Sequence, residues 1–153
     1  MPLYGSKKKR TLKNITMSHT KSYLKDLIYE VNGAAIEVHK ALGSGLLESV
    51  YHKCMAHELK LRNLNFISEL PISLDYKGLK VETLLRCDFL VEDILVVELK
   101  SVKEVSPIHQ TILLSYMKLL SNPIGLMINF NVSNIYKEGQ KTYVNELYRN
   151  LPN

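Results

Sequence analysis

Apolar residues recur every three or four positions between residues 23 and 61. In residues 23–42 this spacing produces one apolar stripe along a helix, formed by Leu24, Leu27, Ile28, Val31, Ala34, Ala35, Val38 and Leu42. The segment Gly43-Ser44-Gly45 then favours a turn. A second helix is predicted over about residues 46–61.

The central part of the chain has the pattern of β-strands. Strands are predicted at residues 66–76, where Pro71 indicates an edge or a bulge, and at residues 79–91 and 94–101. Turns at Lys77-Gly78 and Glu92-Asp93 separate them. Pro107 favours the start of a third helix, and Asn122-Pro123 favours its end.

An apolar strand is predicted at residues 124–130. The last segment, residues 136–148, contains a turn at Glu138-Gly139 and then a short strand or helix. The resulting order, ααβββαβ, predicts an α/β or α+β fold in which a small mixed sheet is flanked by helices.

The hairpin within residues 85–100 alternates strictly between two kinds of side chain. Outside the turn, its odd positions are all apolar and comprise Leu85, Cys87, Phe89, Val91, Leu95, Val97 and Leu99. Its even positions include Arg86, Asp88, Glu98 and Lys100, with Leu90 and Val96 between them. Because successive side chains of a strand point to opposite faces, one face is expected to be core and the other to carry charge.

This pattern also predicts the pairing register. A slip of one residue would mix the two faces. The register that keeps them apart has its turn centred on Asp93 and opposes Phe89 with Val97, Cys87 with Leu99, and Asp88 with Glu98. Asp88, Glu98 and Lys100 are therefore expected to share a face.

Two carboxylates directly opposite each other repel in a sheet, and the pKa of one should rise unless a cation lies between them. Mg²⁺ prefers oxygen ligands and needs only one or two carboxylates besides water and substrate phosphate. Lys100 would stand beside such an ion and stabilise charge on a phosphate. The alternative is an exposed hairpin face on which Lys100 and Arg86 form salt bridges with the two acids.

The net charge of +5 over 153 residues comes from the N-terminus, because residues 1–13 hold five basic residues and no acid. Residues 1–16 are expected to be a basic, disordered tail that either attracts phosphates or is only solvated. Residues 17–153 are expected to be a single domain.

The sequence has no apolar run of membrane-spanning length and no apolar core of a secretory signal. We therefore expect a cytoplasmic protein without a membrane partner. Its two cysteines, Cys54 and Cys87, are expected to be free thiols, because they form no disulfide framework and no CxxC pair.

The segment EVHKALGSGLLESVY, residues 37–51, resembles the GxxExxY family, whose name reads here as Gly45, Glu48 and Tyr51. The resemblance continues, in order, at residues 33–40, 76–78, 87–102, 115–118, 125–130 and 137–139, and covers about residues 24–145. That family is placed in the PD-(D/E)XK nuclease-like superfamily.

The resemblance implies a restriction-endonuclease-like core and a site for Mg²⁺ or Mn²⁺. It implies that Asp88, Glu98 and the backbone carbonyl of Leu99 are metal ligands, that Lys100 is the catalytic lysine, and that Glu48 completes the acidic set. The proline-aspartate start of the superfamily signature is Cys87-Asp88 here.

Further residues are expected to support this site. Tyr51 lies three positions after Glu48 and His52 four positions after it, so all three project from one side of a helix. Gly45 either allows a close approach of backbone or substrate or is a plain turn glycine. His39 lies near the end of the first helix, where a cation is favourable, and is either structural or close to the cleft.

Superfamily relatives often carry a glutamine before the tyrosine of the third helix. Aligning Tyr116 with that tyrosine places Ile112 at the expected position of the glutamine. Gln110 is two positions early, which corresponds to a rotation of roughly 200° around a helix. The glutamine contact is therefore either supplied by Gln110 from a shifted helix or absent.

The sequence thus predicts a divalent-metal-dependent nuclease-like phosphodiesterase that acts on DNA or RNA. The alternative is a catalytically weak or inactive binding or regulatory module on a nuclease fold. That alternative is favoured by the neutral charge of residues 14–153 and by the missing glutamine. A homodimer that pairs exposed edge strands is a third possibility.

Overall fold

The computed structural model describes residues 19–153, so the basic tail predicted at residues 1–16 lies outside the described residues. The elements are α2 (Lys21–Leu42), α3 (Glu48–Leu61), β1 (Phe66–Tyr76), β2 (Leu79–Val91), β3 (Leu95–Lys100), α4 (Pro107–Leu119), β4 (Ile124–Asn129), α5 (Ile135–Glu138), β5 (Gln140–Val144) and α6 (Glu146–Arg149). The predicted order ααβββαβ is confirmed, and the last segment contains both a strand and a short helix.

Local capping explains where the first helix begins. The Thr20 hydroxyl accepts a hydrogen bond from the Tyr23 amide at 3.0 Å, so α2 begins at Lys21, two residues earlier than predicted. At the other end, Gly43 has a φ of 71° and its amide bonds the His39 carbonyl. A glycine adopts this conformation without steric cost, and the helix ends there.

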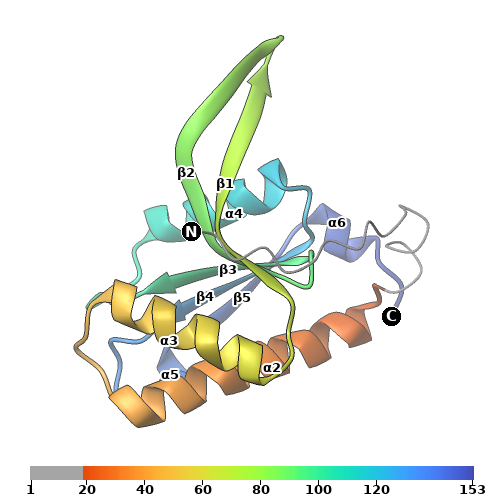
Figure 1. The fold of residues 1–153 in the computed structure, drawn as a ribbon. Helices are drawn as coiled ribbons and strands as arrows, with labels where there is room; N and C mark the ends of the chain where they lie inside the picture. Colours follow the sequence, from red (N-terminus) through yellow and green to blue (C-terminus); the bar gives the residue numbers. More distant parts are fainter. Residues whose placement is uncertain (1–18) are drawn as a thin grey trace.

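The five strands form one mixed sheet in the order β1-β2-β3-β4-β5 (Figure 1). β3 and β4 are parallel, and the other neighbours are antiparallel. Helix α4 forms the crossover between β3 and β4, as a parallel pair requires. Within the described residues, no helix is long and apolar enough to span a membrane.

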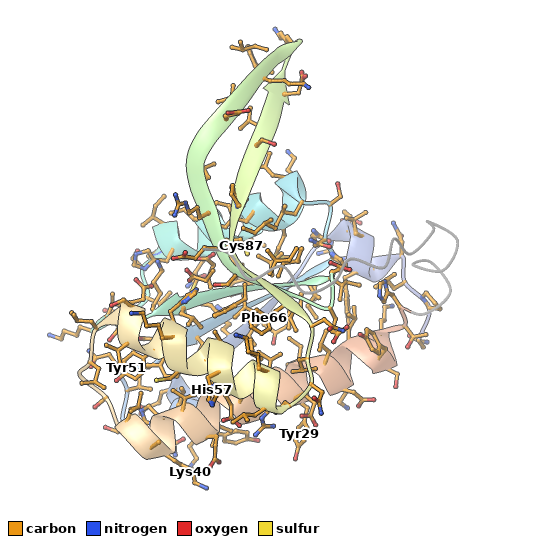
Figure 2. The ribbon with its side chains drawn as sticks, viewed as in Figure 1. Tyr29, Lys40, Tyr51, His57, Phe66 and Cys87 are labelled. Carbon is orange, nitrogen blue, oxygen red and sulfur yellow. The ribbon has the colours of Figure 1, made fainter. Side chains whose placement is uncertain are left out.

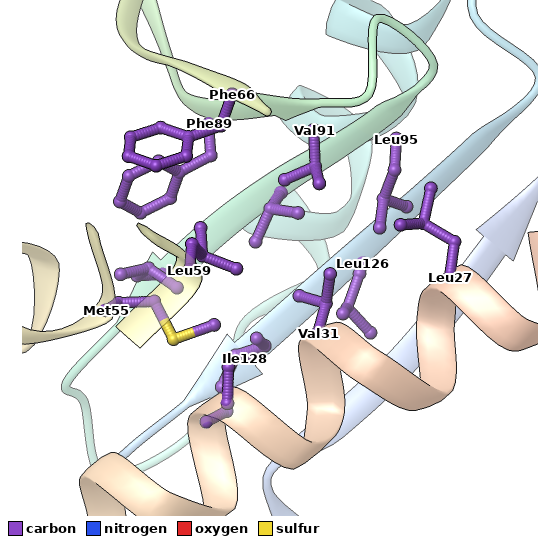
Figure 3. Close-up of a cluster of buried hydrophobic side chains, with 14 of the residues drawn as sticks. Leu27, Val31, Met55, Leu59, Phe66, Phe89, Val91, Leu95, Leu126 and Ile128 are labelled. Atoms are coloured by element: carbon purple, nitrogen blue, oxygen red, sulfur yellow. The ribbon is translucent and has the colours of Figure 1, made fainter. Parts of the chain in front are cut away.

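Both faces of the sheet are covered. Helices α2 and α3 pack on one face around the cluster shown in Figure 3, which includes Val31, Met55, Phe89, Leu95 and Leu126. Helix α4 covers the other face. There Leu113, Tyr116 and Met117 pack against Cys87, Leu90, Val96 and Met127 of the sheet. The two layers of helix therefore exclude water from both sides of the central strands.

The expectation of one core face and one charged face is therefore wrong for the even positions Leu90 and Val96. Both are buried, with exposures of 8% and 0%. The reason is that the apolar side of α4 packs on this face and covers both residues.

The predicted hairpin register, with its turn centred on Asp93, is confirmed by the pairs Phe89↔Val97, Leu90↔Val96 and Val91↔Leu95. The ladder ends there, so the predicted pairs Asp88↔Glu98 and Cys87↔Leu99 are not ladder pairs, and Cys87 and Leu99 pack in different clusters. The predicted grouping of all odd positions on one face is wrong for Leu85 and Cys87. They pack in the α4 cluster, whereas Phe89 and Val91 pack in the α2–α3 cluster.

A local rotation of the paired strands explains that difference. Glu69 of β1 lies between the pairs Ser68↔Phe89 and Leu70↔Cys87 and has a φ of 52°, a left-handed conformation that is rare outside glycine. In β1 the same change of face occurs, since Phe66 belongs to the α2–α3 cluster and Leu70 packs on the α4 cluster. On either side of Glu69 and Asp88, the side chains of both strands therefore alternate between the two sheet faces in opposite phase.

Beyond this point β1 and β2 continue as a two-stranded arm that projects from the body of the molecule (Figure 1). Its pairs include Leu74↔Val81 and Tyr76↔Leu79. The predicted turn at Lys77-Gly78 closes it with φ values of 50° and 89°. Two successive positive φ values match the tight turn whose twist suits a hairpin.

Candidate active site

The predicted site residues come from three elements whose ends meet. Glu98 and Lys100 lie at the C-terminal end of β3, Asp88 lies beside them on β2, and Glu48 is the first residue of α3. Figure 1 shows the end of β3 and the starts of α3 and α4 on the same side of the molecule, beside the base of the arm.

The Asp88 and Glu98 carboxylates are fixed reciprocally by backbone amides. The Asp88 amide donates to Glu98 Oε1 at 3.0 Å, and the Leu99 amide donates to Asp88 Oδ2 at 2.8 Å. The last ladder pair of β2 and β3 is Phe89↔Val97, so these two bonds replace backbone pairing at the strand end. Each carboxylate is therefore held by the strand that carries the other one.

Burial and mutual repulsion shift the titration of this pair. Glu98 is only 6% exposed, and desolvation followed by the charge of Asp88 raises its pKa to about 8. Desolvation also raises the pKa of Asp88, although the Leu99 amide, His52 and Lys100 oppose the shift. Without a cation between them, the two carboxyl groups retain a proton near neutral pH.

Lys100 and Glu48 add a positively charged side chain and a third acidic side chain next to Asp88 and Glu98. Lys100 Nζ lies 3.9 Å from Glu48 Oε1, with side-chain exposures of 23% and 46%. Burial raises the pKa of Glu48, and Asp88 raises it further, whereas Lys100, His52 and His109 lower it. The four predicted residues Glu48, Asp88, Glu98 and Lys100 therefore form one electrostatic group.

The alternative of an exposed hairpin face with salt bridges is wrong. Glu98 is buried, and within the described residues Lys100 pairs with Glu48 rather than with a carboxylate of the hairpin. Arg86 is exposed and forms no ion pair with any described residue.

Tyr51 acts on the loop before Glu48. Its hydroxyl donates to the Gly43 carbonyl at 2.5 Å and accepts from the Leu46 amide at 3.2 Å. The ring is fully buried and stacks on Phe130 at a centroid distance of 4.4 Å; Figure 2 shows Tyr51 at the start of α3. Tyr51 therefore holds the segment that positions Glu48.

Gly45 has a φ of 90°, and a Cβ added there would meet open space. Of the two alternatives for this residue, the structure supports the turn glycine, because the backbone conformation and not a close contact requires it.

Ser101 is a residue of this site that the sequence did not indicate. Its hydroxyl donates to the Leu46 carbonyl at 2.6 Å, which joins the end of β3 to the same loop. Asn129, 4% exposed, accepts from the Val102 amide at 3.1 Å and donates to the Val102 carbonyl at 2.9 Å. The residues just after Lys100 are therefore fixed from two sides.

His52 is a second residue that borders the acids, and its spacing of four from Glu48 had placed it on the same side of the helix. Its Nε2 lies 3.3 Å from the Asp88 carbonyl oxygen, and its ring stacks on Phe89 at a centroid distance of 4.4 Å. His109 Nδ1 accepts from the Ser106 amide at the start of α4, and the charge of His109 acts on Glu48. Two imidazoles thus flank the acids.

The other predicted supporting residues divide into two groups. The Tyr116 ring lies close enough to Glu98 that this charge, after burial, raises the pKa of the tyrosine. His39 instead bonds the Val132 carbonyl through Nε2 at 2.9 Å. Among the described residues, Gln110 forms no side-chain hydrogen bond to Glu48, Asp88 or Glu98, and Ile112 is 37% exposed. A role for Gln110 or His39 in the site remains a prediction.

The donor set can be tested against a divalent cation. Within residues 19–153, no three Asp, Glu, His or Cys side chains are close enough together to hold a metal ion as they stand. The Asp88 and Glu98 pair nevertheless suits Mg²⁺ or Mn²⁺, because such ions are often bound by one or two carboxylates, with water and phosphate as the other ligands. A cation bound between Asp88 and Glu98 would relieve the repulsion that raises the pKa of Glu98.

A comparison with protein families agrees with this geometry. A family model described as the PD-(D/E)XK nuclease superfamily matches residues 25–142. The chain belongs to the PD-(D/E)XK nuclease superfamily. Its α+β architecture, with a mixed sheet between helices, is consistent with the restriction-endonuclease-like fold expected from the sequence. No curated protein and no solved structure matches the chain significantly.

The superfamily signature begins with proline and aspartate, and the aspartate corresponds to Asp88 in this chain. At the position before this aspartate the chain has Cys87, which is fully buried and donates from Sγ to the Phe89 carbonyl at 3.0 Å. Figure 2 shows Cys87 at the base of the arm. Burial raises the pKa of this thiol, so it serves as an apolar packing residue. Both Cys54 and Cys87 are free, as predicted.

Proposed function

We propose that this protein is a divalent-metal-dependent nuclease that hydrolyses phosphodiester bonds of DNA or RNA. The observation that carries the proposal is the reciprocal bonding of Asp88 and Glu98 to backbone amides, with Lys100 on the same strand end. A buried glutamate next to a partly buried aspartate that repels it destabilises a fold, and proteins retain such groups mainly at functional sites.

Asp88 and Glu98, with the Leu99 carbonyl and Glu48, are the residues proposed to hold Mg²⁺ or Mn²⁺. A bound ion of this kind would polarise the phosphoryl group and a water molecule. The chain's own contribution is positional. The Leu99 amide fixes Asp88, the Asp88 amide fixes Glu98, and Tyr51 and Ser101 fix the loop before Glu48.

Lys100 is proposed to bind a phosphate oxygen and stabilise the negative charge that develops in the transition state. Glu48, whose pKa is raised by burial, would accept the proton of the attacking water. The new bond joins the water oxygen to phosphorus, the bond from phosphorus to the leaving oxygen breaks, and that oxygen takes a proton from solvent.

The decisive experiment is cleavage of single- and double-stranded DNA and RNA with Mg²⁺ or Mn²⁺. Lys100→Ala and Asp88→Ala should each lower the rate by about a thousandfold or more. Lys103→Ala is the matched control, because Lys103 is exposed on the loop after β3 and forms no ion pair with a described residue. Cleavage that persists in both site variants would contradict the proposal.

A second candidate is a binding or regulatory module with weak or lost catalysis. The observation that favours it is the balance of 15 basic and 15 acidic residues in the part of the chain after residue 13. A metal titration separates the two candidates: the nuclease requires a cation that binds between Asp88 and Glu98, whereas a module without metal chemistry does not.

A further inference from the structure

Five exposed apolar residues lie at the starts of α3 and α4, each within three residues of Glu48 or His109. Leu47 and Ile108 are 74% and 60% exposed, and Leu46, Val50 and Ile112 are each more than a third exposed. Leu47 directly precedes Glu48, and Ile108 directly precedes His109, whose charge acts on Glu48. Leu46 is bonded through its carbonyl to Ser101, next to Lys100. We call Leu46, Leu47, Val50, Ile108 and Ile112 the apolar rim.

Leu47 departs from two local rules at once. It occupies the N-cap of α3, where it makes no side-chain hydrogen bond, although Ser, Thr, Asp or Asn would satisfy a free amide of the first turn. It also exposes most of its apolar side chain to solvent. A residue that serves neither helix capping nor burial is expected where a ligand uses it.

The charges around the rim restrict what that ligand can be. Lys100, His52 and His109 are the basic groups that act on Glu48. Acids and bases are equal in number after residue 13, so this part of the chain as a whole carries no net positive charge. Tight binding of duplex DNA usually neutralises many phosphates at once. The site therefore suits a ligand with few phosphates in contact and with apolar surface on either side.

We propose that the site binds a single-stranded segment of nucleic acid, with one phosphate at Lys100 and the faces of the neighbouring bases on Leu47 and Ile108. This inference rests on the proposed function and adds the strandedness of the substrate. In a duplex the base faces are stacked on one another and cannot reach the rim. In a single strand each base presents an apolar face that is free to pack on a side chain.

Fluorescence anisotropy tests the inference with a labelled oligonucleotide and its duplex, both as DNA and as RNA. All proteins carry Glu48→Gln, which removes the proposed proton acceptor but keeps Lys100, and are measured with Mg²⁺, so that the probe stays uncleaved. The single strand should bind more tightly than its duplex. Leu47→Ser and Ile108→Thr should each weaken single-strand binding about fivefold, which corresponds to the loss of a partly buried apolar contact.

Leu61→Ser is the matched control, since Leu61 is 64% exposed at the opposite end of α3. It should leave the affinity unchanged. Leu47→Ser has a second readout: serine is a better N-cap than leucine, so the melting temperature should rise while binding weakens. A loss of binding through partial unfolding would lower the melting temperature instead.

Equal or tighter binding of the duplex, unchanged affinity of both rim variants, or no binding of any oligonucleotide would each overturn the inference. The proposed nuclease activity can fail separately. Rim-dependent single-strand binding without metal-dependent cleavage by the unsubstituted protein would support this inference and contradict the nuclease. Cleavage confined to duplexes would support the nuclease and contradict the inference.

Discussion

The first half of β3 stabilises the fold, whereas the buried charge in its second half destabilises it. Leu95, Val96 and Val97 are fully buried and lie in regular ladders with both β2 and β4. Glu98 and Lys100 keep the ladder with β4, but the pairing with β2 is replaced by carboxylates bonded to amides. Within six residues the strand changes from groups that stabilise the fold to groups that oppose it.

This difference shows how the fold supports its site. Burial of the first half supplies the rigid support that two repelling carboxylates require, and burial of Glu98 raises its pKa to about 8. Substitutions in the two halves should therefore change stability in opposite directions.

The largest effect is expected in the first half. Leu95→Ala removes a fully buried side chain between α2 and the sheet and should lower the free energy of unfolding by roughly 3 kcal/mol. For a domain of this size the melting temperature should fall by about 9 °C. Differential scanning calorimetry measures the change. Leu119→Ala, at a 39% exposed site, is the control and should change it little. A comparable loss in the control would contradict the assignment of the core.

The second half should respond with the opposite sign. Glu98→Gln keeps an oxygen to accept the Asp88 amide but removes the ionised form, so it should raise the melting temperature at pH 8 by roughly 5 °C. The same variant should abolish cleavage. Glu104→Gln, an exposed carboxylate on the loop after β3, is the control and should have no effect. A lower melting temperature for Glu98→Gln would mean that the charge is stabilising.

The pH dependence follows from the same group. The pKa of Glu98 is about 8 in the folded protein and 4.5 without the fold, so the folded state holds its proton more tightly. Its favourable contribution is complete below pH 4.5 and is lost as pH rises through 8. Melting temperatures of the unsubstituted, metal-free protein should fall over this window more steeply than those of Glu98→Gln. Parallel curves would contradict the assignment.

A divalent cation should reverse part of that loss. At pH 8, Mg²⁺ at about ten times its dissociation constant stabilises by about 1.4 kcal/mol, or roughly 4 °C. The shift should be absent in Asp88→Asn, which removes one carboxylate charge. A shift of the same size in that variant would place the cation elsewhere.

The smallest effect concerns the loop before Glu48. Ser101→Ala removes the hydrogen bond to the Leu46 carbonyl and should cost about 1 kcal/mol, or about 3 °C. Ser115→Ala is the matched control, because that hydroxyl bonds only the Thr111 carbonyl within α4. Cleavage should slow in Ser101→Ala and not in Ser115→Ala. Equal rates would show that the loop is held without Ser101.

Sequence patterns predicted the fold well where each strand stays in phase. The register of β2 and β3 followed from hydrophobic alternation, because a slip would have exposed the core residues around Phe89 and Val97. The alternation failed at Cys87, since the rotation opposite Glu69 depends on a backbone conformation that the sequence does not indicate.

Some residues of the site could be predicted from the sequence and others could not. Asp88, Glu98 and Lys100 were proposed from spacing along one hairpin and Glu48 from the resemblance to a family, and the structure brings the four together. Ser101 was missed because its partner, the Leu46 carbonyl, lies 55 residues away and is a backbone atom. Long-range bonds to backbone leave no residue pattern.

The rotation at Glu69 has a consequence for how this protein can change in evolution. The arm beyond it alternates independently of the body, so removing equal lengths from its two strands would leave the phase of Asp88 and Phe89 intact. An insertion between Glu69 and Asp88 on the arm side is tolerable in the same way, whereas one between Asp88 and Glu98 would rotate one of these two carboxylates into the core. The length of the arm can therefore change while the geometry of the site at its base stays the same.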